Sequence, residues 1–159
     1  MSTVVDPVGS DLSKILSTLK LSGLKQTLPE RLLLARQTNM GHAAFLELLL
    51  ADEVARRGTR SAALRAGKAG LDPAMRLDTF DDLPDLAYDR TLWSDLTSLR
   101  FTENATGVLI LGPVGVGKTH LATALGHIAI RRRHSVVYAR ADKLFTRLRG
   151  ARLDNTLEA

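Results

Sequence analysis

The strongest constraint on this sequence is a short glycine-rich segment in its second half. The segment reads Gly112, Pro113, Val114, Gly115, Val116, Gly117, Lys118 and Thr119. It fits the pattern of a glycine, four variable residues, Gly, Lys and then Ser or Thr, which is the phosphate-binding P-loop. The backbone can turn tightly enough to point consecutive N–H groups at one anion only where residues lack a Cβ. Gly115 and Gly117 are such residues. The segment therefore predicts a pocket of main-chain amides.

The residues on both sides of this loop predict an α/β fold. Val108 to Leu111 is an unbroken apolar run, which is typical of a buried parallel strand. From Thr119 to Ile130 the apolar residues keep helical spacing. Ser135 to Ala139 reads as a second strand, which the intervening helix joins to the first in a right-handed βαβ unit. We expect a P-loop domain built on a parallel sheet.

The last two residues of the loop suit a triphosphate with its metal ion. The Lys118 ammonium would lie on the β and γ phosphates, and the Thr119 hydroxyl would ligate Mg²⁺. The amino end of the following helix offers its positive dipole to the same anion. The alternative is a glycine-rich turn that binds nothing, and the flanking pattern favours nucleotide. Gly112 to Thr119 are thus the predicted ATP site, with Thr119 as the Mg²⁺ ligand.

The first 70 residues predict a separate helical domain. Apolar residues at helical spacing indicate helices over 10–19 and 27–37. A third helix carries an apolar surface too wide for a helix that faces solvent. This surface comprises Phe45, Leu46, Leu48, Leu49, Leu50 and Val54. We expect this helix to be mostly buried at the centre of a small bundle.

A basic segment follows the third helix between Val54 and Gly70. It contains Arg56, Arg57, Arg60, Arg65 and Lys68 and no acidic residue. Clustered positive charge binds DNA phosphates because it releases their counterions. The formal net charge of +5 agrees with a polyanionic partner but is weak evidence for one. The alternative is a solvated basic helix face, and the charge pattern alone does not separate the two interpretations.

Residues 71–89 predict an acidic linker. After Arg76 its carboxylates are Asp78, Asp81, Asp82, Asp85 and Asp89, with no Lys or Arg among them, and two prolines interrupt the segment. The spacing lacks the glycine and final Glu of a calcium loop, so capping and solvation are favoured over a metal site. Residues 90–159 then form the partial P-loop domain. It includes a helix over 90–99 with Trp93 in its core, and a last helix that Asp142 caps.

Composition limits the cellular setting. The chain has 159 residues and no cysteine, which suits the cytoplasm and excludes disulfides and thiolate metal sites. The longest apolar run, Phe45 to Ala51, contains Glu47 and is too short to cross a bilayer. We expect a cytoplasmic protein with no membrane segment.

The sequence shows no second acidic element of a P-loop ATPase. Such enzymes use an acidic residue after a second buried strand to hold Mg²⁺ and order water, and an arginine that stabilises developing charge. After Thr119 the carboxylate side chains are those of Asp142, Asp154 and Glu158, and none follows an apolar strand directly. We therefore expect an ATPase domain that is cut short, and whether it hydrolyses ATP is an open question.

The ordered set of motifs resembles the IstB family of insertion-sequence ATP-binding proteins, which are relatives of DnaC-type helicase loaders in the AAA+ class. The resemblance depends on four stretches. They are LILGPVGVGKTHLA at 109–122, FLELLLADEVARR at 45–57, LDTFDDL at 77–83 and VVYARADKL at 136–144. The family's acidic Walker B element, sensor residues and arginine finger have no counterparts in this sequence.

That resemblance implies an ATP-dependent helper for transposition. Such a protein assembles as an oligomer on DNA, engages the transposase of the same insertion element and directs the choice of target. Two alternatives remain open. One is a DnaC-like helicase loader in DNA replication, since the motifs are shared. The other is a non-catalytic DNA- or transposase-binding module in which the P-loop is vestigial.

Overall fold

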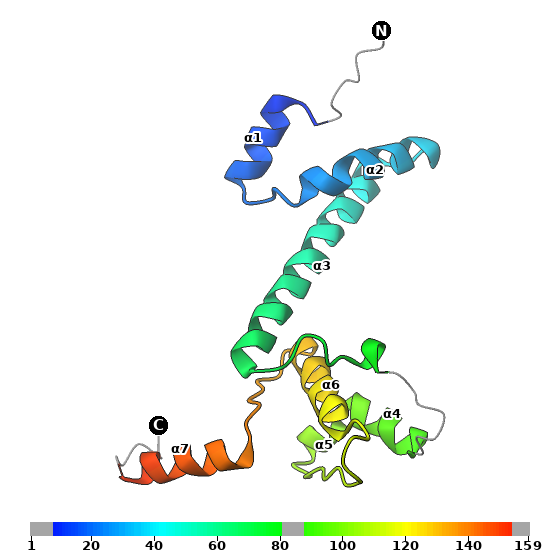
Figure 1. The fold of residues 1–159 in the computed structure, drawn as a ribbon. Coiled ribbons are helices and arrows are strands. Elements are labelled where there is room, and N and C mark those ends of the chain that lie inside the picture. Colours follow the sequence, from blue (N-terminus) through cyan, green and yellow to red (C-terminus); the bar gives the residue numbers. More distant parts are fainter. Residues whose placement is uncertain (1–7, 81–87, 154–159) are drawn as a thin grey trace. The chain divides into compact units, whose positions relative to one another are not determined.

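The computed structural model describes residues 8–80 and 88–153, and Figure 1 shows its helices. Contacts divide the chain into two units, residues 1–61 and 62–159. The predicted domain boundaries after residues 70 and 89 stay predictions. The elements in chain order are α1 (Ser10–Thr18), α2 (Leu24–Gln37), α3 (His42–Ala69), η1 (Leu77–Thr79), α4 (Arg90–Ser98), α5 (Arg100–Glu103), α6 (Lys118–Arg131) and α7 (Ala141–Leu153).

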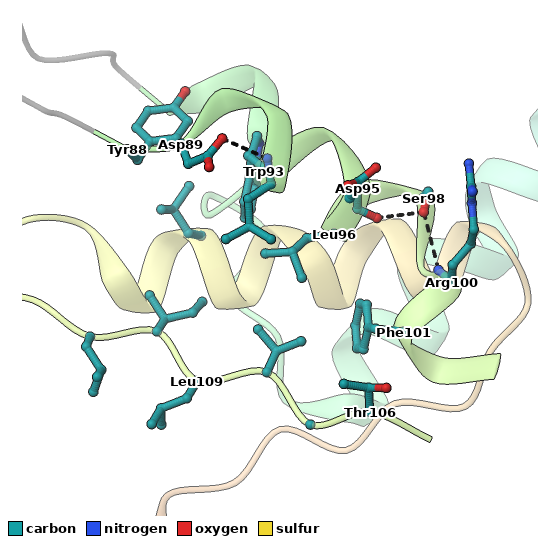
Figure 2. A pocket seen from close by; sticks show the side chains of 16 residues that line it. Tyr88, Asp89, Trp93, Asp95, Leu96, Ser98, Arg100, Phe101, Thr106 and Leu109 are labelled. Atoms are coloured by element: carbon teal, nitrogen blue, oxygen red, sulfur yellow. Dashed lines mark hydrogen bonds between the residues drawn. The ribbon is translucent and has the colours of Figure 1, made fainter. Parts of the chain in front are cut away.

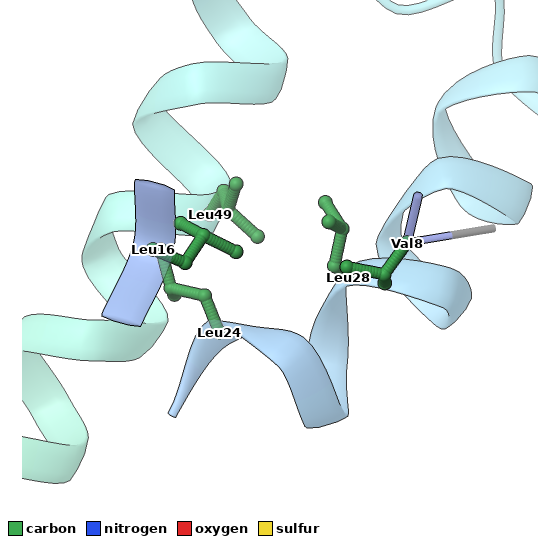
Figure 3. Packing of buried hydrophobic residues seen from close by; sticks show 5 residues of the cluster. All are labelled: Val8, Leu16, Leu24, Leu28 and Leu49. Atoms are coloured by element: carbon green, nitrogen blue, oxygen red, sulfur yellow. The ribbon is translucent and has the colours of Figure 1, made fainter. Parts of the chain in front are cut away.

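The first unit is held together by a small leucine-rich core, as Figure 3 shows. The buried residues of this core are Val8, Leu16, Leu24, Leu28 and Leu49. Val8 lies two residues before α1, and the other four come from α1, α2 and the amino-terminal half of α3. Each helix repeats its apolar residues every three or four positions, so these side chains lie on one face of each helix. The three predicted helices are confirmed, although α2 begins at Leu24 rather than near Thr27.

The prediction that the third helix is mostly buried is wrong. Leu46, Leu50 and Val54 are 55%, 48% and 71% exposed, whereas Leu49 is buried at 7%. The core that includes Leu49 also contains residues of α1 and α2, and it covers one side of α3. Phe45 and Leu48 are half-buried, so the exposed part of this apolar surface consists of Leu46, Leu50 and Val54. The helix also continues through Gly58 and Gly67 to Ala69, so the basic segment is fully helical.

One carboxylate in the first unit is buried and doubly paired. The Glu53 side chain is 4% exposed and accepts hydrogen bonds from Arg56 and Arg57. The Arg56 Nε–Oε2 and Nη2–Oε1 distances are 2.7 and 2.6 Å, and the Arg57 Nε–Oε1 distance is 2.7 Å. The hydrogen bonds from Arg56 are the main cause that lowers the pKa of Glu53 from 4.5 to about 2. Arg57 adds to this effect, and desolvation opposes it.

This pairing predicts an acid-sensitive first unit. Because the folded pKa is lower than the unfolded one, the stabilisation is complete above about pH 4.5 and is lost as pH falls towards 2. Helical content followed by circular dichroism during acid titration should therefore fall in this window. Glu53→Gln should flatten that fall, whereas Glu47→Gln on the exposed surface of α3 should not. Identical titrations of wild type and Glu53→Gln would contradict the assignment.

The second unit is built around α6. Its buried residues are Leu121, Thr123, Ala124, Leu125, Ile128, Ala129 and Ile130. Ile130 packs with Ala66 and Ala69 of α3 and with Leu71, while Ile128 and Ala129 pack with Leu99 at the end of α4. The predicted helix over 119–130 is confirmed as α6, and burial of its apolar side makes it the central element of this unit.

The predicted parallel sheet is wrong. No strand occurs in residues 8–80 and 88–153, so the described structure is helical rather than α/β. A strand needs hydrogen bonds from a neighbouring strand, and in the described residues no backbone hydrogen bond joins 108–111 to 135–139. Instead, the Tyr138 N–H donates to the carbonyl of Ala69, at 2.9 Å. Leu109, Leu111 and Val137 are 80%, 79% and 77% exposed, which does not fit a buried sheet.

The remaining helices partly follow the sequence. Helix α4 is confirmed, and the Asp89 carboxylate caps it by accepting from the N–H groups of Thr91 and Leu92. Trp93 is half-buried rather than a core residue. Helix α7 begins at Ala141, so Asp142 lies inside its first turn, where it accepts from Arg140 Nε at 3.3 Å. Three acidic linker residues, Asp81, Asp82 and Asp85, lie outside the described residues.

Candidate functional site

The glycine-rich segment turns sharply into the amino end of α6. Gly115 and Gly117 have φ angles of +90° and +85°, in the left-handed region that side-chain-bearing residues avoid. Gly117 is the residue that caps α6, and the helix begins at Lys118. These two positions therefore require glycine, which is the physical reason for their places in the motif.

The backbone N–H groups at this turn are available to an anion. Within the described residues, the N–H groups of Gly117, Lys118 and Thr119 donate to no backbone carbonyl. The first N–H groups of a helix have no partner inside it, and they carry its partial positive charge. A group of oxygen acceptors with negative charge matches such donors. The donor set at the start of α6 therefore fits a polyphosphate.

The two polar side chains of the motif lie at the same turn. Lys118 is half-buried, and its ammonium donates to the carbonyl of Pro113 within the loop. Thr119 is exposed in the first turn of α6, and Val114 at the tip of the loop is fully exposed. A cation beside free amide donors adds to the attraction for phosphate oxygens. The residues present thus fit the triphosphate that the sequence predicts.

Sequence reasoning missed two residues beside this turn, Phe80 and His120. A Cβ added at Gly117 would lie 2.8 Å from Phe80 Cε2, so the phenyl ring packs directly on the cap of α6. The Phe80 and His120 rings meet edge to face, with centroids 5.2 Å apart and planes 66° apart. Neither residue belongs to a periodic pattern, and the spacing of 40 residues between them gave no signal in the sequence.

The five predicted DNA-contact residues all lie on α3. Arg56, Arg57 and Arg60 belong to the first unit, and Arg65 and Lys68 belong to the second. Arg56 and Arg57 bind Glu53, and Arg57 also donates to the Lys20 carbonyl at 2.6 Å.

The three cations in the carboxy-terminal part of α3 differ in their contacts. Arg65 donates to the Ile130 carbonyl at 2.9 Å, so its guanidinium holds α3 to the end of α6. Arg60 and Lys68 are exposed and make no ion pair with the part of the chain that the structure describes. In residues 8–80 and 88–153 no ion pair occupies Arg60 or Lys68, so these two cations of the basic segment are available to an external anion.

A separate cavity of about 660 Å³ lies between α4, α5 and residues 106–111. Figure 2 shows Trp93, Leu96, Phe101 and Leu109 among its lining side chains. The carboxylates of Asp89 and Asp95 are also among its lining residues, and the cavity contains no residue of Gly112–Thr119. Its described lining is mostly apolar, with two acidic residues and one basic residue, Arg100, so it lacks the cluster of N–H donors that a polyphosphate needs.

A glycine turn with unpaired amides, followed by Lys and Thr at the start of a helix, is typical of proteins that bind nucleotides through phosphate. Comparison of the sequence with known families makes this more specific. Residues 14–159 match the model of the IstB-like ATP binding proteins, and the chain belongs to this family.

Two relatives show the extent of the match. The chain is 35% identical over 154 residues to an ATP-binding protein in an insertion sequence of Mycobacterium tuberculosis, which covers 97% of this chain and 60% of the relative. It is 34% identical over 148 residues to an ATP-binding protein of insertion sequence IS21 from Pseudomonas aeruginosa, covering 93% and 56%. The chain thus spans somewhat more than half the length of these two relatives. No helix of the described residues has the length and hydropathy to cross a membrane.

Proposed function

We propose that this chain binds Mg²⁺·ATP at the turn before α6 and serves as an ATP-binding helper in the transposition of an insertion sequence. The observation that carries the proposal is the set of N–H groups at Gly117, Lys118 and Thr119, which donate to no backbone carbonyl of the described residues and lie next to the Lys118 ammonium. Family membership supports ATP as the anion that these donors receive.

Each residue of the turn has a defined part in this proposal. Gly115 and Gly117 let the backbone approach the β-phosphate, and Lys118 neutralises the β and γ oxygens. The Thr119 hydroxyl, one residue further along α6, supplies one ligand to Mg²⁺. When bound, the metal ion shields the negative charges of the phosphate tail. The chain's own contribution is binding and orientation at a helix terminus.

The partners follow from the setting of the relatives. Their names place them in insertion sequences, which favours transposition over the loading of a replicative helicase. We propose that DNA, the transposase of the same element and further copies of this chain are its partners. These roles belong to the whole protein, and this chain spans 60% of the first relative.

The nucleotide proposal is tested by competition. A fluorescent ATP analogue is titrated into the protein with Mg²⁺ and displaced by ATP, ADP, AMP or adenosine. Because the proposed donors contact the phosphate tail, affinity should fall at each loss of phosphate, and adenosine should displace nothing at millimolar concentration. Equal displacement by ATP and adenosine would assign binding to the base instead. Negligible binding of every nucleotide would favour the module with a vestigial loop.

A DNA contact is proposed for the exposed cations Arg60 and Lys68. Each phosphate contact adds about one unit to the slope of log K against log salt concentration, so Arg60→Ala and Lys68→Ala should each flatten it. Arg57→Ala is the matched control, since this guanidinium already binds Glu53 and the Lys20 carbonyl. An unchanged slope in both test variants would remove α3 from the DNA interface.

A further inference from the structure

Residues 71–80 lie along α6 as a strap that is attached at both ends. At one end Leu71 packs at Gly126, where an added Cβ would be 3.0 Å from Leu71 Cδ2. At the other end Phe80 packs on Gly117. The absence of a side chain at each glycine is what lets the strap approach the helix so closely.

Two histidines of α6 hold the backbone of this strap. His120 Nε2 lies 2.6 Å from the Arg76 carbonyl oxygen, and His127 Nε2 lies 2.8 Å from the Asp72 carbonyl oxygen. Because a carbonyl only accepts, both Nε2 atoms carry the hydrogen in these bonds. The histidines are seven residues apart, which is about two helical turns, so both lie on one face of α6. Each makes the same kind of hydrogen bond to a carbonyl of the strap.

The two bonds differ in what lies beside them. The η1 turn follows Arg76 directly, and the Thr79 N–H in that turn donates to the Arg76 carbonyl at 3.3 Å, while the Thr79 hydroxyl donates to the Ala74 carbonyl at 2.5 Å. The His120 ring also contacts the Phe80 ring, which in turn covers Gly117. His127 has no such connection to the glycine turn within the described residues. Of the two histidines, His120 is the one that connects the strap to the start of α6 in the described residues.

From this geometry we infer that His120 is a positioning residue for the phosphate-binding turn, acting through the Arg76 carbonyl and Phe80 to hold Gly117 in its left-handed conformation. The inference deepens the proposed function and depends on it, since the ligand concerned is the triphosphate. By linkage, a ligand that fixes the turn must also stabilise the strap at Arg76.

The test compares His120→Ala with His127→Ala, which loses the same bond away from the turn. For a fluorescent ATP analogue, His120→Ala should raise the Kd about fivefold, the effect of one neutral hydrogen bond. His127→Ala should stay within about twofold, on the same scale. His120→Gln restores a donor at a similar reach and should recover most of the affinity, a rescue that general destabilisation would not produce.

The strap itself gives a second readout, because trypsin cleaves after Arg76. ATP should slow this cleavage in wild type and in His127→Ala but not in His120→Ala, with cleavage after Arg36 in the first unit as internal reference. Equal loss of affinity in both alanine variants, or equal protection of Arg76 in both, would overturn the inference. If wild-type protein binds no nucleotide, the competition experiment refutes the proposed function, and the positioning role is refuted with it.

Discussion

Replacing Lys118 with alanine should weaken ATP binding by about tenfold to a hundredfold, the effect of losing a hydrogen bond to a charged group. The ammonium lies at the turn and already donates to the Pro113 carbonyl of the same loop. It therefore needs only a local change of direction to reach phosphate oxygens at the start of α6. The Kd of a fluorescent ATP analogue, measured with Mg²⁺ present, reports the change.

Lys143→Ala is the matched control for this experiment. Lys143 is an exposed lysine of α7, so its removal changes net charge by the same amount away from the glycine turn. Its Kd should equal that of wild type at physiological salt, where distant surface charges are screened. Equal weakening in both variants would show a general charge effect, and unchanged binding in Lys118→Ala would contradict the role of this lysine.

Gly117→Ala should impair both the turn and the strap. The φ of +85° costs a residue with a Cβ about 1–2 kcal/mol, and the new methyl group would lie 2.8 Å from Phe80 Cε2. Either the ring moves or the turn changes its conformation. We expect a loss of ATP affinity of at least about tenfold, because one turn conformation aligns the N–H groups and about 1.4 kcal/mol corresponds to a factor of ten.

The control here is Gly67→Ala in the interior of α3. An added Cβ at Gly67 meets no atom within 4 Å, and its backbone is helical. Alanine at such a position stabilises a protein by about 0.4–1 kcal/mol through the unfolded chain. The thermal midpoint of Gly67→Ala should rise slightly with no change in Kd. Wild-type affinity in Gly117→Ala would mean that this backbone conformation has no part in binding.

The sequence predicted the features that depend on neighbours in the chain. Helix α6 follows from its apolar spacing, and the turn before it follows from glycines whose φ values are positive. Both depend on interactions within a few residues, so a pattern in one sequence contains enough information for them. The family resemblance added the ATP ligand, and the match over residues 14–159 agrees with it.

The predictions that failed depend on partners distant in the chain. Apolar residues at 108–111 fit a strand by composition, but strand formation depends on a neighbour that pairs with the backbone. In the described residues the Tyr138 N–H binds the end of α3 instead. The prediction that α3 is mostly buried failed for a related reason. An apolar surface shows which residues a helix could bury, but not how many other helices cover it.

The contacts around the candidate site were equally distant. His120 and the Arg76 carbonyl are 44 positions apart, and both residue types are common on protein surfaces.

The pairing of Arg56 and Arg57 with Glu53 is local, at three and four residues, and attention to i, i+3 and i, i+4 spacing would have found it. Because Arg56 and Arg57 are paired with Glu53, the basic segment has less positive charge available for an external anion.

The most direct test of the central claim is a two-dimensional ¹H–¹⁵N correlation spectrum of the labelled chain during titration with Mg²⁺·ATP. Binding through the phosphate tail predicts that the amide resonances of Gly115, Gly117, Lys118 and Thr119 shift most and in parallel, with Phe80 and His120 following. Shifts confined to residues around the cavity at Trp93, or no shifts at saturating ATP, would contradict the assignment of this turn as the nucleotide site.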